Sequence, residues 1–136
     1  MRAARRLAAL VAMGLAAAAA GYALGRQSAP TDFKGVAQQV LASIDLGGEI
    51  DSVENRELRL SRAVVAPGGH IGLHSHRGDP SIVYILSGVL TNHHAGTSKE
   101  FGPGEVFAES GPQAHWVENR GPAAVTFIVA NIHKRE

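Results

Sequence analysis

The stretch His70–Gly88 reads HIGLHSHRGDPSIVYILSG and carries three of the seven histidines of this 136-residue chain. Side chains alternate between the two faces of a β-strand, so His74 and His76 should point the same way, with Cβ atoms roughly 6.5–7 Å apart. Two imidazoles at that separation can close around one metal ion. The following SIVYIL segment is typical of a strand buried on both faces. Histidines beside such a core need partners for their ring nitrogens, which favours a binding site over a solvated strand face.

The sequence on both sides of this stretch has the pattern of an all-β domain. Short apolar runs alternate with turns that hold most of the 16 glycines and 6 prolines. We predict strands at 57–65, 71–76, 81–91, 106–110, 115–119 and 124–132, with a hairpin or loop containing a short strand at 92–105. Strands at this regular spacing predict a sandwich or a closed barrel.

The segment before these strands has a different periodicity. The apolar residues of FKGVAQQVLASI, at 33–44, recur at helical spacing, and LGGE at 46–49 would end a helix there. We therefore predict a signal peptide or membrane anchor at 1–26, a linker and short helix at 27–48, and a β-barrel domain at 49–134.

The N-terminus has the composition of an export signal. Arg2, Arg5 and Arg6 precede an uncharged apolar run from Leu7 to Leu24, and a basic segment followed by an apolar one is typical of a signal peptide. The run is also near the minimum length of a membrane span, so an uncleaved anchor and an ordinary cytosolic helix are the alternatives. We predict an exported protein, either periplasmic or anchored in the cytoplasmic membrane by this segment alone.

Charge and cysteine content exclude several kinds of function. The chain has 13 Lys+Arg against 12 Asp+Glu, a net charge of +1, so it lacks the basic surplus of a nucleic-acid-binding protein. It has no cysteine, which removes disulfides, cysteine zinc sites and thiol nucleophiles. The chemistry is left to histidines and carboxylates.

Glycines, histidines and an asparagine recur at two sets of fixed spacings. The first set is Gly68, His74, His76 and Gly88, and the second is Gly104, His115 and Asn119. These spacings resemble the two motifs of the cupin superfamily, G-x5-H-x-H-x(3,4)-E-x6-G and G-x5-P-x-G-x2-H-x3-N. Within the second motif, Ser110 stands in place of the proline and Pro112 in place of the glycine two residues after it. With the surrounding strands, the resemblance covers residues 50–132.

The resemblance implies a cupin-type β-barrel (a jelly roll, or double-stranded β-helix) with a metal ion held by His74, His76 and His115. It also implies a homodimer, because cupins commonly associate through sheet edges and N-terminal strands. The family's fourth ligand is a glutamate, and Ser81 stands in its place. A hydroxyl is a poorer ligand than a carboxylate, which leaves three alternatives: a three-histidine site, a site completed by Asp79 or Glu109, or a barrel that has lost its metal.

Three neutral imidazoles would leave a bound ion its full charge, for Lewis-acid chemistry, acidified water or an anionic substrate. Iron, manganese, zinc, nickel and copper all suit imidazole, and some cupin dioxygenases use three histidines. His70 and Glu109 are the candidate catalytic proton carriers. We predict an oxygenase, isomerase or lyase acting on a small polar molecule; the alternatives are a non-catalytic module that binds a metal or small molecule, and a purely structural barrel.

Overall fold

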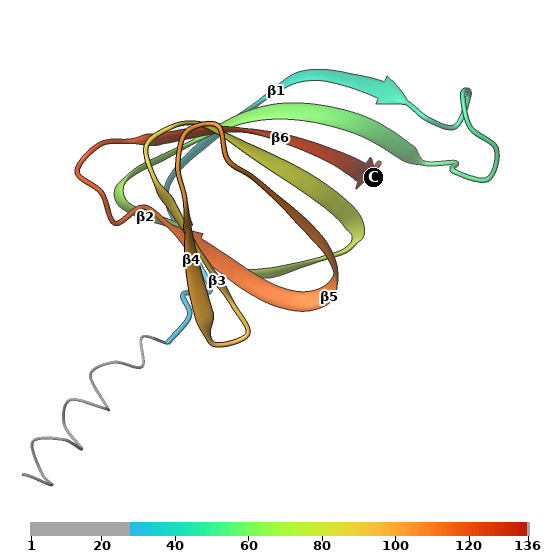
Figure 1. Cartoon of the computed structure of the whole chain (residues 1–136). Helices are drawn as coiled ribbons and strands as arrows, with labels where there is room; N and C mark the ends of the chain where they lie inside the picture. Colours follow the sequence, from blue (N-terminus) through green and yellow to red (C-terminus); the bar gives the residue numbers. More distant parts are fainter. Residues whose placement is uncertain (1–27, 136) are drawn as a thin grey trace, which may run out of the picture.

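The computed structural model describes residues 28–135, so the predicted export segment lies outside the described residues. Within them the chain forms six β-strands and no helix, which confirms the all-β prediction (Figure 1). The strands are β1 (Phe33–Asp45), β2 (Arg56–Ser87), β3 (Leu90–His94), β4 (Thr97–Phe101), β5 (Val106–Glu118) and β6 (Val125–Lys134). No helix within the described range is long and apolar enough to cross a membrane.

Strand β2 is one bent strand of 32 residues where the sequence pattern suggested three separate strands. Its first part pairs with β1 and β6, its middle part with β5, and its last part with β5 and again with β6, so it wraps around the barrel (Figure 1). Gly68 and Gly78, at φ of 70° and 79°, lie along the bends, in a conformation that glycine adopts without steric cost. The strand order is β1-β2-β5-β3-β4, with β6 paired to both parts of β2.

The helix predicted at 33–44 is wrong: these residues form strand β1. It pairs antiparallel with β2 from Phe33 opposite Ile71 to Asp45 opposite Glu57. Two register shifts in this pairing, after Lys34 and after Val40, break the simple alternation of faces, so the apolar residues recur at helix-like intervals. The backbone pairing along β2 overrides the local pattern, and the β-branched residues of the segment suit a strand.

The hydrophobic core lies inside the barrel and draws its residues from strands β2 to β6. Its buried members are Ala63, Val65, Val83, Ile85, Leu90, Phe101, Val117, Val125 and Phe127. Burying each large side chain of this kind contributes about 1.5–3 kcal/mol. The core therefore fixes the relative positions of β2 and β5, the two strands that carry the predicted metal ligands.

Candidate metal centre

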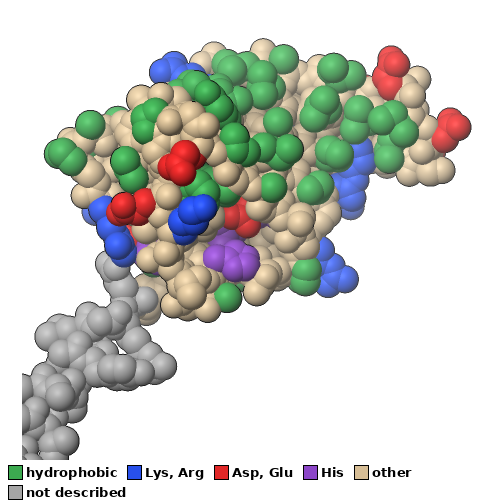
Figure 2. Space-filling view, in the orientation of Figure 1, with side chains coloured by type: hydrophobic (Ala, Val, Ile, Leu, Met, Phe, Trp, Pro, Cys, Tyr) green, Lys and Arg blue, Asp and Glu red, His purple; other side chains and the backbone are tan. Residues whose placement is uncertain are grey.

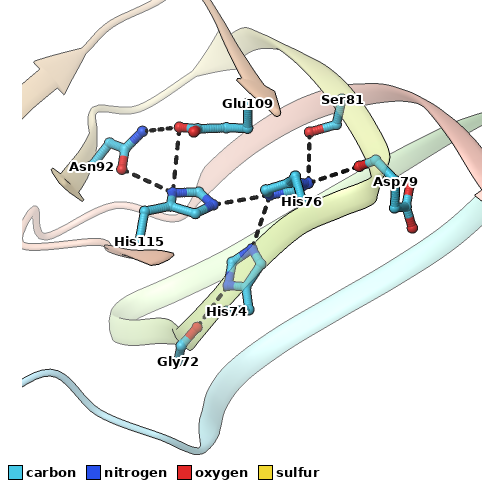
Figure 3. A network of polar contacts seen from close by, with 8 residues as sticks. All are labelled: Gly72, His74, His76, Asp79, Ser81, Asn92, Glu109 and His115. Atoms are coloured by element: carbon cyan, nitrogen blue, oxygen red, sulfur yellow. Dashed lines mark hydrogen bonds and ion pairs between the residues drawn. The ribbon is translucent and has the colours of Figure 1, made fainter. Parts of the chain in front are cut away.

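The structure brings the three predicted ligands together. His74 and His76 lie on β2, and His115 on β5 is the register partner of His74. Nε2 of His76 lies 3.1 Å from Nε2 of His74 and 2.9 Å from Nε2 of His115 (Figure 3). Of the residues that the structure describes, these histidines form the one group of three or more ligating side chains with all ligand atoms within 4.8 Å.

Backbone carbonyls hold the other ring nitrogen of the two β2 histidines. His74 Nδ1 lies 2.7 Å from the carbonyl oxygen of Gly72, and His76 Nδ1 lies 3.0 Å from that of Asp79. A carbonyl oxygen only accepts hydrogen bonds, so each Nδ1 carries the proton and donates it. The Nε2 atom of each ring then presents a lone pair.

A side-chain network does the same for His115. Its Nδ1 lies 3.0 Å from Oδ1 of Asn92, whose Nδ2 donates to Oε1 of Glu109 at 2.5 Å (Figure 3). The bond to Glu109 orients the Asn92 amide, because a carboxylate accepts from the NH₂ end and leaves the oxygen for His115. The Nε2 atom of this buried ring therefore presents a lone pair as well.

Three lone pairs consequently converge with no proton between them. The three Nε2 lone pairs repel one another unless a cation lies between them. Two nitrogens bound to one ion at 2.0–2.1 Å lie about 2.9–3.4 Å apart, which the two observed separations of 3.1 and 2.9 Å match. The described residues thus fit a transition metal that prefers imidazole.

Burial favours the uncharged form of His115 and His74. Desolvation lowers the pKa of His115 from 6.5 to about 3, with His74, His76 and His94 adding to the effect. Burial also lowers the pKa of His74, and His76 nearby contributes. Neutral imidazole is the form that binds metal, so the site is ready to do so at neutral pH.

Neither of the two candidate carboxylates joins the three Nε2 atoms. Oε1 of Glu109 lies 3.3 Å from Nδ1 of His115, on the far side of that ring. The Asp79 carboxylate accepts from Asn131 at 2.6 Å and lies 3.0 Å from His133 Nδ1, while Ser81 Oγ lies 3.2 Å from His76 Nδ1. Of the alternatives above, this geometry favours the three-histidine site.

His70 lies apart from the cluster. Its Nε2 is 3.1 Å from Oδ1 of Asp32, and hydrogen bonding to His70 lowers the pKa of that carboxyl. His70 does not line the cavity that contains the three ligands, whereas Glu109 does. The catalytic roles of both residues stay predictions.

The three ligands face a cavity of about 210 Å³ inside the barrel. Residues of β1, β2, β5 and β6 form most of its wall, and Leu90 of β3 completes it. Phe33 lines it while remaining 64% exposed, so this side chain lies at the mouth. A small molecule that enters there reaches the histidine cluster.

Sequence reasoning missed the groups that orient the ligands. Asn92 fell in a segment interpreted as a hairpin or loop, and its place beside His115 follows from the β3–β5 register, where His94 lies opposite His115. The carbonyls of Gly72 and Asp79 have no side-chain signature at all. The one local signal is the glycine at position 72. A Cβ there would lie 2.4 Å from the Asp32 carbonyl oxygen, so the close approach of these two backbone segments requires glycine.

Known proteins share this fold and part of this sequence. A family model described as Cupin domain matches residues 61–131. The oxalate-binding protein of Thermotoga maritima is 32% identical over 83 residues, which span 60% of this chain and 68% of the relative.

Two crystal structures show the same fold at low identity. One, described as a predicted oxalate decarboxylase from Thermotoga maritima, has a TM-score of 0.58 and 23% identity, covering 77% of this chain and 93% of the other. The polyketide cyclase RemF from Streptomyces resistomycificus has a TM-score of 0.61 and 23% identity, covering 78% and 70%. Their different names show that the fold alone does not determine the chemistry.

Proposed function

Since this chain belongs to the cupin domain family, we propose that it holds one divalent transition metal through His74, His76 and His115 and presents it to a small molecule in the barrel. The convergence of three Nε2 lone pairs, each fixed by a hydrogen bond at Nδ1, carries this proposal. Iron, manganese, zinc, nickel and copper all suit the donor set.

The chain's own residues hold the ligands and limit access to them. Gly72 and Asp79 orient the two β2 rings through their carbonyls, and the Asn92–Glu109 pair orients His115. A carboxylate linked to the far nitrogen of a ligating histidine raises the basicity of that ligand. When bound, the metal would supply Lewis-acid or redox activation of whatever binds beside it. Oxygenase, isomerase and lyase reactions all fit this arrangement.

A non-catalytic binding module is the second candidate. Both carboxylates that line the cavity are already engaged, Asp79 by Asn131 and His133 and Glu109 by Asn92 and His115. Neither carboxylate is free to move a proton without breaking these bonds. The relative named for binding oxalate also supports a binding role. Measured turnover of a ligand, or dioxygen consumption in its presence, would favour an enzyme over a binding module.

Metal analysis tests the site itself. The full chain, produced without a histidine tag, should contain about one equivalent of a transition metal per chain. His76→Ala and His115→Ala should lose it, whereas His70→Ala, a matched control outside the cavity, should keep it. A wild-type protein that takes up none of the five metals, with no thermal shift on their addition, would sink the proposal.

We also propose export, because the basic and apolar pattern of residues 1–26 is that of a signal or anchor. Fractionation of cells that express the full chain tests it. We expect the protein in the periplasmic or the membrane fraction. Recovery in the cytoplasm alone, at full length, would contradict it.

A further inference from the structure

We propose that the ligand of the cavity carries a single anionic, metal-chelating oxygen group on an uncharged, largely apolar body. This inference rests on the proposed metal site, since the metal is the partner of the anionic group. Two features of one cavity support it: the charge at the histidine end and the chemistry of the remaining wall.

The histidine end favours an anion. The three ligands are neutral imidazoles, so they leave the charge of a divalent ion uncompensated. The carboxylate of Glu109 lies behind His115 and supplies one negative charge at most. The hydroxyl of Ser81 supplies none. An anionic oxygen donor on the ligand would therefore offset the remaining charge, and a second donor beside it would complete a chelate.

The rest of the wall favours an uncharged body. It is mainly aliphatic and aromatic, and its largest apolar side chains besides Phe33 are Ile71, Leu90, Phe107 and Phe127. Phe33 extends this apolar surface to the mouth, its ring centroid 6.5 Å from that of His74. A charged group placed against such a wall loses its hydration and gains no partner.

No cationic side chain among the described residues of this wall would receive a second negative charge. Within the described part of the chain, no lysine or arginine lines the cavity. Arg59, on the neighbouring part of β2, is held by Glu57 at 2.5 Å and does not line it. The wall instead contains the engaged carboxylates of Asp79 and Glu109, which repel an anion. A ligand with two well-separated carboxylates is therefore disfavoured.

The cavity also limits the size of the ligand. Its volume of about 210 Å³ holds roughly seven water-sized groups at about 30 Å³ each. A six-carbon hydroxy acid, with nine non-hydrogen atoms, fits this space because covalently bonded atoms lie closer together than separate water molecules. The pair 2-hydroxy-4-methylpentanoate and malate makes a matched probe, because both present the same α-hydroxycarboxylate head and differ in an isobutyl tail against a carboxymethyl tail of similar shape.

The test is to titrate each acid into the full chain loaded with Co(II) and to monitor binding by the visible absorption of the metal. We expect both acids to change the spectrum, and 2-hydroxy-4-methylpentanoate to bind at least about tenfold more tightly, as apolar pockets discriminate. Equal or tighter binding of malate, or no binding of either acid, would overturn the inference. A chain that shows no Co(II) spectrum at all would instead overturn the metal site.

A charge placed in the wall gives a second, independent readout. Gln38 lines the cavity yet is exposed, so Gln38→Arg should fold normally and provide the missing cation. This variant should reverse the preference toward malate. Gln39→Arg adds the same charge on the opposite face of β1, where strand alternation points it away from the cavity, and should leave the preference unchanged. The same response in both variants would contradict the assignment of the wall.

Discussion

Glu109 is a buried acid that acts through His115 and Asn92, both of which it contacts. Glu109→Gln keeps the size of the side chain and removes its charge. Since such partners of metal ligands are typically worth ten- to hundredfold in affinity, we expect metal affinity to fall by about that factor without unfolding. Competition with a chromophoric chelator measures the change. Glu105→Gln, in a turn outside the cavity, is the matched control; equal affinities in the two variants would refute the role.

The lowered pKa values of His74 and His115 predict how the metal-free protein responds to acid. The unfolded chain takes up protons at these histidines near pH 6.5, whereas the folded protein holds His115 neutral down to about pH 3. Below pH 6.5 the unfolded state therefore binds more protons, and the free energy of unfolding should fall as pH falls toward 3. Above pH 6.5 these groups contribute no slope.

Urea unfolding of the metal-free chain between pH 4 and 8 measures this dependence. His115→Gln removes the group with the largest shift, so the loss of stability between pH 6.5 and pH 4 should be smaller in this variant. Addition of metal should oppose the acid effect until protons displace the ion from the histidines. An identical pH slope in the wild-type protein and in His115→Gln would contradict the assignment.

At the residue scale the sequence predicts the histidine cluster well and the groups that orient its rings poorly. His74 and His76 are visible because strand alternation places them on one face, and His115 because its spacing to Gly104 and Asn119 matches a family motif. Their hydrogen-bond partners depend on backbone carbonyls and on the pairing of β3 with β5. Neither leaves a pattern in one sequence, since any residue supplies a carbonyl and register is set by the assembled sheet.

Strand β6 supports the histidine cluster through the bend of β2 before Pro80. Asn131 and His133 both lie on this strand and bind the Asp79 carboxylate, while the Asp79 carbonyl holds His76. Asn131→Ala and His133→Ala should each loosen this bend and weaken metal binding by about tenfold. Ile132→Ala, on the opposite face of the same strand, is the matched control. Unchanged affinity in both test variants would show that the bend holds its position without β6.

The bounds and connections of the strands were harder to predict from the sequence than their presence. The segments around the histidines are strands as predicted, but three of them join into β2 because its bends keep the backbone paired on both sides. Strand β1 could not be distinguished from a helix, since its register shifts mimic helical spacing. Both errors concern long-range pairing, which local periodicity does not report.

The whole molecule exposes an apolar face on the outside of the sheet formed by β1, β2, β5 and β6. Figure 2 shows hydrophobic side chains gathered over the part of the surface formed by β1, β2 and β6. The large residues of this outer face are Ile44, Leu58, Leu60, Ile82, Tyr84, Leu86, Val106 and Ile132, which are 39–55% exposed. Pairings such as Ile82 with Ala130, and Ala130 with Leu60, make these residues neighbours across the strands.

We propose that a second copy of the chain covers this outer face. Eight such side chains, exposing on the order of 90 Å² each, approach the about 800 Å² per subunit that a stable interface buries. Soluble monomers rarely expose contiguous apolar patches of that size. A face-to-face pair would also leave the cavity free, because the cavity lies on the inner side of the same strands.

Light scattering coupled to size-exclusion chromatography should therefore give twice the mass of one chain. The double variant Leu60→Glu with Ile82→Glu places two charges at the centre of the face and should yield a monomer, because the desolvated carboxylates would have no partners. Val89→Glu changes an apolar residue of similar exposure, 44%, in the turn before β3 and should stay dimeric. A wild-type protein that is monomeric at every concentration, or a double variant that remains dimeric, would contradict dimerisation through this face. Retention of bound metal by the monomeric variant would then show that each barrel builds its histidine site from its own strands.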